Sequence, residues 1–143
     1  MISTLLVAAV LSSTAYPEWS DLSICYPGQR NTPEKTCIVD GDTLWLTGTM
    51  WRLRDVDTPE PQRGNSHCGG PDIELELSGI ATARLQELLN SNEWLLEDHG
   101  LERNGRGPRS LGVIRIDGVD VGDILIDEGL ARRWPDGHVF WCD

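Results

Sequence analysis

Two short acidic segments carry the residue types most suited to metal and phosphate chemistry. Residues 40–42 read Asp-Gly-Asp, and residues 57–60 read Asp-Thr-Pro-Glu. Carboxylate and carbonyl oxygens are the ligands that hard cations such as Ca²⁺ prefer, and an arginine such as Arg52 can bind phosphate oxygens. Each segment lies at the end of an expected strand. If the strands pair, we expect a cation and a phosphate to be bound at the same place.

Asp42 and Asp57 are the expected metal ligands, and the backbone carbonyl of Thr58, just before Pro59, is the natural third ligand. Such a set leaves the metal open to water and substrate, as a catalytic metal requires. The alternative for residues 40–42 is a plain hairpin turn, since Asp-Gly is one of the commonest turn signals.

Glu60 and Arg52 are the candidates for the remaining chemistry. Because Pro59 redirects the backbone, the Glu60 carboxylate could face the water on a metal and act as general base. Arg52 could stabilise charge that builds on the phosphate oxygens. A loop glutamate on the surface and an arginine in a structural ion pair are the alternatives. Arg109, on a later strand, could bring a second guanidinium to the same place.

The elements that must position these residues follow from hydrophobic periodicity and turn signals. Their order favours a mainly β chain with helices (α+β), a small barrel of about five strands with helices packed on it. The expected strands are 36–39, 43–46, 50–56, 93–97 and 109–117, with a hairpin tip at 47–49. The expected helices are 75–89 and a second one that Asp120 caps and Gly129 ends.

Taken together, the motifs resemble the staphylococcal nuclease (thermonuclease) family. The resemblance rests on Asp-Gly-Asp-Thr at 40–43, Arg-Leu at 52–53 and Asp-Thr-Pro-Glu at 57–60, and it continues from 109 to 131. It implies a five-stranded OB-fold-type barrel with two to three packed helices. It also implies Ca²⁺-dependent hydrolysis of DNA and RNA that leaves 3′-phosphate and 5′-hydroxyl ends. The family's domain would span 36–135.

The resemblance implies a role for each matched residue. Ca²⁺ would be bound by Asp42, Asp57 and the Thr58 carbonyl, with Asp40 as an outer carboxylate, Glu60 acting on water, and Arg52 with a second arginine holding the phosphate. The second arginine is ambiguous. A Gly-Arg pair nominates Arg106, whereas counting back from the Asp-Gly turn at 117–118 nominates Arg109, which we favour because a shifted register would turn side chains to the wrong face.

The sequence departs from the family where the nucleotide would lie. Pro135 and Gly137 stand where the family has tyrosines, so Trp134 or Trp141 would have to supply any stacking. The net charge of −11 is also unusual for a chain that binds phosphate backbones. A catalytically silent OB-fold module that binds a protein or an oligonucleotide is therefore the rival hypothesis.

The N-terminus and the cysteines indicate export. Residues 1–15 contain an apolar run followed by small residues, as in a signal peptide. The four cysteines fit disulfides, and we favour Cys25–Cys37 and Cys68–Cys142 over the other pairings. We therefore expect a secreted or periplasmic monomer, with no membrane span, that has an N-terminal extension at 16–35 and a tail at 136–143.

Overall fold

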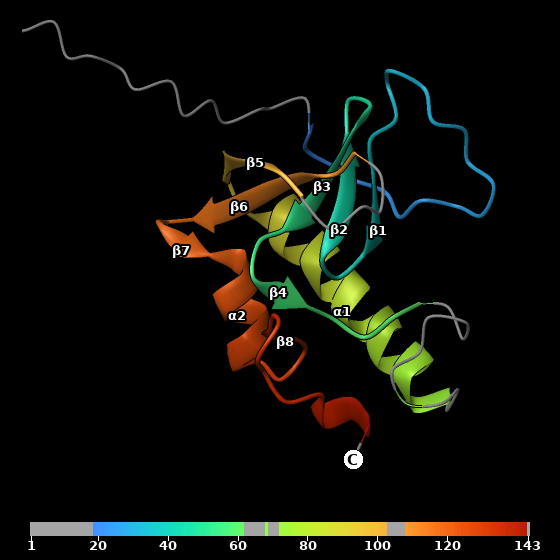
Figure 1. The fold of residues 1–143 in the computed structure, drawn as a ribbon. Helices are drawn as coiled ribbons and strands as arrows, with labels where there is room; N and C mark the ends of the chain where they lie inside the picture. The colour runs from blue at the N-terminus through green and yellow to red at the C-terminus, as the bar shows by residue number, and fades with distance from the viewer. Residues whose placement is uncertain (1–18, 62–67, 69–71, 103–107, 143) are drawn as a thin grey trace, which may run out of the picture.

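The protein combines a main mixed sheet and a small two-stranded sheet with two helices in the computed structural model, which describes residues 19–61, 68, 72–102 and 108–142 (Figure 1). The predicted α+β class is confirmed. The described elements, in chain order, are β1 (Cys37–Asp40), β2 (Thr43–Leu46), β3 (Thr49–Leu53), β4 (Val56–Asp57), α1 (Asp72–Ser91), β5 (Leu95–Leu101), β6 (Ser110–Ile116), β7 (Val119–Asp120), α2 (Val121–Asp127), β8 (Arg132–Arg133) and the 3₁₀ turn η3 (Phe140–Cys142).

The main sheet has the order β1-β2-β3-β6-β5, with β7 paired to β6, and β4 pairs separately with β8. Strands β1, β2 and β3 form an antiparallel meander, whereas β3 and β6 run parallel. Among the described strands no pairing joins β1 to β5, so the OB-fold-type barrel stays a prediction. The parallel pairing of β3 with β6 brings residues 51–53 beside residues 110–112.

The predicted turn between the first two strands is present, and glycine is required in it. A Cβ atom at Gly41 would lie 2.8 Å from Thr58 Cγ2 and 2.9 Å from the Cβ of Ala81 on α1. Such distances are well inside van der Waals contact. The absence of a side chain at Gly41 therefore lets the Asp-Gly-Asp turn pack directly against the second acidic segment and against α1.

The prediction of one continuous strand over 50–56 is wrong. β3 ends at Leu53, and Asp55 adopts a φ of 59°, a left-handed conformation that turns the chain away from the sheet. The Trp134 N–H then donates to the Asp55 carbonyl at 3.0 Å. Residues 56–57 consequently leave the main sheet and pair with β8 instead, which decides the position of Asp57.

Both predicted helices are present. The helix expected at 75–89 extends over Asp72–Ser91 and buries Ala81 and Leu85 completely. In α2 the side chain of Asp120 accepts a hydrogen bond from the Gly122 N–H at 2.7 Å, the predicted N-cap. Gly129 follows the last turn with a φ of 72°, in the position that ends a helix with a left-handed residue.

The two favoured disulfides, Cys25–Cys37 and Cys68–Cys142, are both formed. The first ties the N-terminal extension to β1, and the second joins the residues before α1 to η3. The predicted signal peptide at 1–15 lies outside the described residues. Within the described residues, no helix has both the length and the apolar character needed to cross a bilayer.

Candidate active site

The two acidic segments meet, as the sequence predicts. One carboxylate oxygen of Asp42, Oδ2, accepts hydrogen bonds from the Thr58 N–H at 3.0 Å and from the Thr58 hydroxyl at 3.2 Å. The other oxygen accepts from the Thr43 hydroxyl at 2.7 Å. Asp42 and Thr58 are only 5% and 1% exposed. The hairpin turn and the Asp-Thr-Pro-Glu segment therefore form one buried polar site.

Arg52 lies beside this site from the neighbouring strand β3. Its Nη1 is 3.8 Å from Asp42 Oδ2 and donates to the Val56 carbonyl at 2.7 Å. The residue is buried, with 8% exposure. The carbonyl bond and the ion pair restrict the guanidinium to one orientation next to the carboxylates, because each hydrogen bond to a charged group favours a single rotamer.

Asp57 makes an ion pair that sequence reasoning missed. Arg132 Nε donates to Asp57 Oδ2 at 2.8 Å, and the two side chains are 8% and 3% exposed. The pair is a direct consequence of the β4–β8 pairing, in which Asp57 lies opposite Arg132. Residues 129–131, Gly-Leu-Ala, end the region that resembles the nuclease family, and Arg132 follows them directly. This closeness to the matched region was the one signal in the sequence that Arg132 lies near the site.

Glu60 belongs to a cluster of acidic residues with Asp40, Asp42 and Asp57, and these surroundings disfavour its charge. Burial, followed by the charges of Asp42 and Asp57, raises the pKa of Glu60 to about 7. The Glu60 N–H also donates to Glu74 Oε1 at 3.3 Å, which brings a buried carboxylate from α1 into the cluster. Glu74 was not predicted from the sequence.

Burial and neighbouring negative charge also raise the pKa values of two other acidic residues, Asp40 and Asp57. Burial and the neighbouring Asp42 carboxylate raise the pKa of Asp40 well above its usual range. Burial and Asp42 also raise the pKa of Asp57, against the opposing effect of Arg132. Burial and mutual repulsion therefore disfavour the charged forms of these carboxyl groups, and a cation bound beside them would favour ionisation.

The residues expected to hold a metal ion supply two buried carboxylates and a backbone carbonyl. In the part of the chain that the structure describes, no group of three or more His, Cys, Asp and Glu side chains is arranged to hold a metal ion. Asp42 and Asp57 are nevertheless close enough for the first to raise the pKa of the second. Carboxylate oxygens in a buried anionic cluster are the ligands that Ca²⁺ selects.

Arg109 comes close to Arg52 through a shared carboxylate. Glu102, at the end of β5, lies 3.4 Å from Arg52 Nε and 2.6 Å from Arg109 Nε, and its side chain is 8% exposed. The structure thus brings the favoured second arginine to the site, whereas Arg106 lies outside the described residues. Glu102 was not predicted as a site residue, because nothing local indicates that it lies between two guanidiniums.

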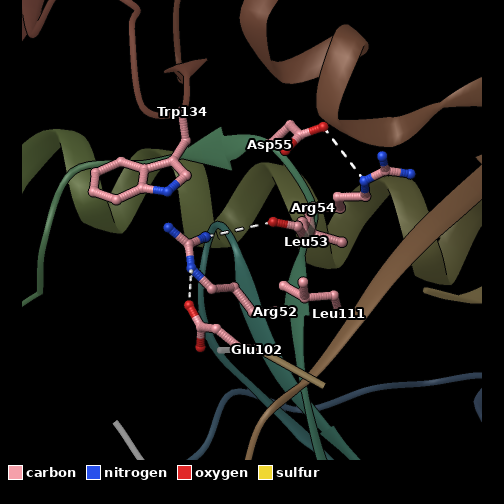
Figure 2. Close-up of a pocket in the computed structure, with 7 residues that line it drawn as sticks. All are labelled: Arg52, Leu53, Arg54, Asp55, Glu102, Leu111 and Trp134. Atoms are coloured by element: carbon pink, nitrogen blue, oxygen red, sulfur yellow. Dashed lines mark hydrogen bonds and ion pairs between the residues drawn. The ribbon is translucent and has the colours of Figure 1, made fainter. Parts of the chain in front are cut away.

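A pocket of about 360 Å³ opens beside Arg52, and Figure 2 shows the residues that line it. Its floor includes Leu53 and Leu111, from the parallel strands β3 and β6. The Trp134 ring faces the Arg52 guanidinium, with 5.7 Å between the ring centroid and Cζ (Figure 2). Trp134 is 42% exposed and available for stacking, whereas Trp141 is 3% exposed and belongs to the core.

Two Bacillus subtilis proteins are similar in sequence to this chain. The chain is 38% identical over 98 residues to the SPbeta prophage-derived endonuclease YokF of Bacillus subtilis (strain 168), which covers 66% of this chain and 31% of that protein. It is 37% identical over 98 residues to Endonuclease YncB of the same organism, over 66% of this chain and 44% of that protein. No family model matches the chain. The chain spans less than half the length of each of these relatives, and both are named endonucleases.

Proposed function

We propose that this chain is a Ca²⁺-dependent nuclease of the staphylococcal nuclease type, which hydrolyses phosphodiester bonds in DNA and RNA. The observation that carries the proposal is that Asp42, Asp57 and Arg52 are buried near one another: Arg52 pairs with Asp42, both act on the charge of Asp57, and Arg109 shares Glu102 with Arg52. Carboxylates that could hold a metal ion beside arginines that could bind phosphate suit metal-dependent phosphodiester hydrolysis. The similarity to two proteins named endonucleases supports the same conclusion.

Asp42, Asp57 and the Thr58 carbonyl would hold the ion. When bound, Ca²⁺ would offset the charge of the carboxylates and that of the phosphate oxygens. The anionic character of the cluster supports this part of the proposal, because burial and mutual repulsion raise the pKa values of Asp40, Asp57 and Glu60. A bound divalent cation relieves that repulsion.

Glu60 is the general base of the proposed reaction. Its carboxylate takes a proton from the attacking water, and a pKa near 7 suits proton transfer at neutral pH. The water oxygen attacks phosphorus as the bond to the 5′-oxygen breaks, and the leaving 5′-oxygen takes up a proton from solvent, which leaves a 3′-phosphate and a 5′-hydroxyl. Arg52 and Arg109 bind the non-bridging oxygens, where negative charge increases in the transition state.

The acidic surface is compatible with this function because the arginines gather at the site. The net charge of −11 predicts weak general attraction to a polyanion. Arg52 and Arg132 are both buried near the cluster, and their charge acts in a region of low dielectric constant. The proposed enzyme therefore binds nucleic acid locally, with little contribution from the rest of its surface.

We also propose that the protein works outside the cytoplasm. The two disulfides support this location, since such bonds persist in oxidising compartments.

The test is cleavage of supercoiled plasmid and of single-stranded RNA by the oxidised protein, with Ca²⁺ or with EDTA. We expect cleavage only with Ca²⁺, and mass spectrometry of the products should find 3′-phosphate ends. Arg52→Ala and Glu60→Ser should each lower the rate by about 10²–10³-fold. Arg115→Ala is the matched control, because Arg115 is a partly exposed arginine that pairs with Glu97 away from the site.

Two results would overturn the proposal. Unchanged activity in Arg52→Ala and Glu60→Ser would mean that the assigned site is wrong. Binding of oligonucleotides without any cleavage would favour the rival hypothesis of a silent binding module.

A further inference from the structure

We infer that Arg132 is a positioning residue: it holds Asp57 in the one orientation that places a bound metal ion for catalysis, and its positive charge lowers the affinity for that ion. This inference rests on the proposed function and concerns a residue that the sequence motifs did not identify. It starts from the ion pair between Arg132 Nε and Asp57 Oδ2, at 2.8 Å, between two side chains that are 8% and 3% exposed.

Arg132 is itself fixed by the turn that follows β8. Its Nη1 donates to the Gly137 carbonyl at 2.6 Å and to the Pro135 carbonyl at 3.2 Å. The Trp134 ring covers the guanidinium, with 5.2 Å between the ring centroid and Cζ. A planar guanidinium that donates to a carboxylate and to two carbonyls has a single orientation. Asp57 is thus bound to a rigid donor.

The strand pairing adds a second restraint. Asp57 and Arg132 are opposite each other in the β4–β8 pair, so backbone and side chain specify the same contact. The next residue, Arg133, points to the other face, where it is 53% exposed and pairs with Asp123. The two residues of β8 have the same charge and the same side chain, but only Arg132 contacts the cluster.

The positive charge of Arg132 lowers the affinity of Asp57 for a divalent cation, although its hydrogen bond fixes the carboxylate. A cation next to Asp57 competes electrostatically with a divalent ion bound by the same carboxylate. Without Arg132, Asp57 loses its hydrogen-bonded cation, while the charges of Arg52, Asp42 and Glu60 still act on it, so a bound Ca²⁺ would offset more of its negative charge. Arg132 therefore lowers Ca²⁺ affinity and keeps the carboxylate in one rotamer, which maintains the position of the ion.

The experiment compares Arg132→Met with the matched control Arg133→Met in the oxidised full chain. Calorimetric titration with CaCl₂ should show that Arg132→Met binds Ca²⁺ about tenfold more tightly than the wild type, which corresponds to ~1.4 kcal/mol of binding free energy. The kcat for plasmid cleavage should fall at least about tenfold, with KM for DNA unchanged, because the phosphate contacts are retained. Arg133→Met should match the wild type in affinity and in kcat.

A purely structural role for Arg132 predicts the opposite sign, because loss of a buried contact loosens the site and weakens Ca²⁺ binding. Equal or weaker Ca²⁺ binding by Arg132→Met would therefore refute the inference. If circular dichroism shows that Arg132→Met is unfolded, the variant Arg132→Lys tests the inference in its place. Lysine keeps the charge but lacks the fork of donors, so Ca²⁺ affinity should stay within about twofold while kcat falls. An unchanged kcat in Arg132→Lys would overturn the inference.

The wild-type titration separates this inference from the proposed function. If the wild type binds no Ca²⁺, the proposed function fails and the role of Arg132 fails with it. If the wild type binds Ca²⁺ and Arg132→Met does not bind more tightly, only the role of Arg132 fails.

Discussion

Replacing Glu60 with glutamine should stabilise the metal-free protein above neutral pH. The pKa of Glu60 rises from 4.5 to about 7 on folding, first because the residue is partly buried and then because Asp42 and Asp57 repel its charge. Between pH 4.5 and 7 the folded state consequently binds more protons than the unfolded state. The contribution of Glu60 to the free energy of unfolding therefore falls as the pH rises through this window and remains lower above it.

The size of the effect follows from the shift. One pKa unit corresponds to about 1.4 kcal/mol, so the full shift corresponds to roughly 3.5 kcal/mol. Because Glu60 is only partly buried, solvent screening reduces the expected value to about 1–2 kcal/mol. Glutamine keeps the shape of the protonated acid and cannot ionise. At pH 8 in EDTA, Glu60→Gln should unfold with a free energy about 1–2 kcal/mol higher than the wild type.

Urea denaturation at pH 4, 6 and 8 in EDTA measures this difference. The two proteins should be equally stable at pH 4, and the gap should open by pH 8. Glu93→Gln is the control, because Glu93 is exposed just before β5 and its replacement should change stability by less than about 0.5 kcal/mol. Added Ca²⁺ should narrow the gap, since the ion offsets the repulsion. A gap that does not depend on pH, or a less stable variant at pH 8, would refute the reasoning.

The remaining predictions concern the arginines and the packing of α2. Arg109→Ala should lower the cleavage rate at least about 10²-fold, and Arg106→Ala should leave it near the wild-type value; the reverse result in plasmid assays would make Arg106 the second phosphate ligand. Glu102→Gln should lower KM for DNA in steady-state kinetics, because the Glu102 carboxylate competes with the substrate phosphate for Arg52 and Arg109. A higher KM would show instead that Glu102 holds the two arginines in the orientation that binds phosphate. Gly122→Ala should lower the free energy of unfolding by about 1–3 kcal/mol, because the new Cβ would lie 2.4 Å from Val56 Cγ2; unchanged thermal unfolding would contradict this packing.

The local elements were readable from the sequence. The Asp-Gly turn, the capped helix α2 and the paired cysteines depend on interactions within a few residues or on simple residue counts. The meeting of Asp42 with Thr58 was also expected, because the β2–β3 hairpin brings Asp42 near the end of β3, but the turn at Asp55 that carries residues 56–58 out of the sheet was not expected. The types of chemistry at the site therefore follow from residue identity and spacing.

Only the tertiary structure decided which groups surround these residues. Asp57 and Arg132 are 75 positions apart, and their contact exists because the left-handed Asp55 turns β4 away from the main sheet toward β8. Glu102 reaches both arginines because β3 and β6 pair in parallel while β5 lies along β6. Such contacts have no local pattern, since they are stabilised by the packing of segments that meet only in the folded chain. The sequence thus determined the acidic residues and the arginines, whereas the fold determined their counter-charges, and those counter-charges set the electrostatics of the site.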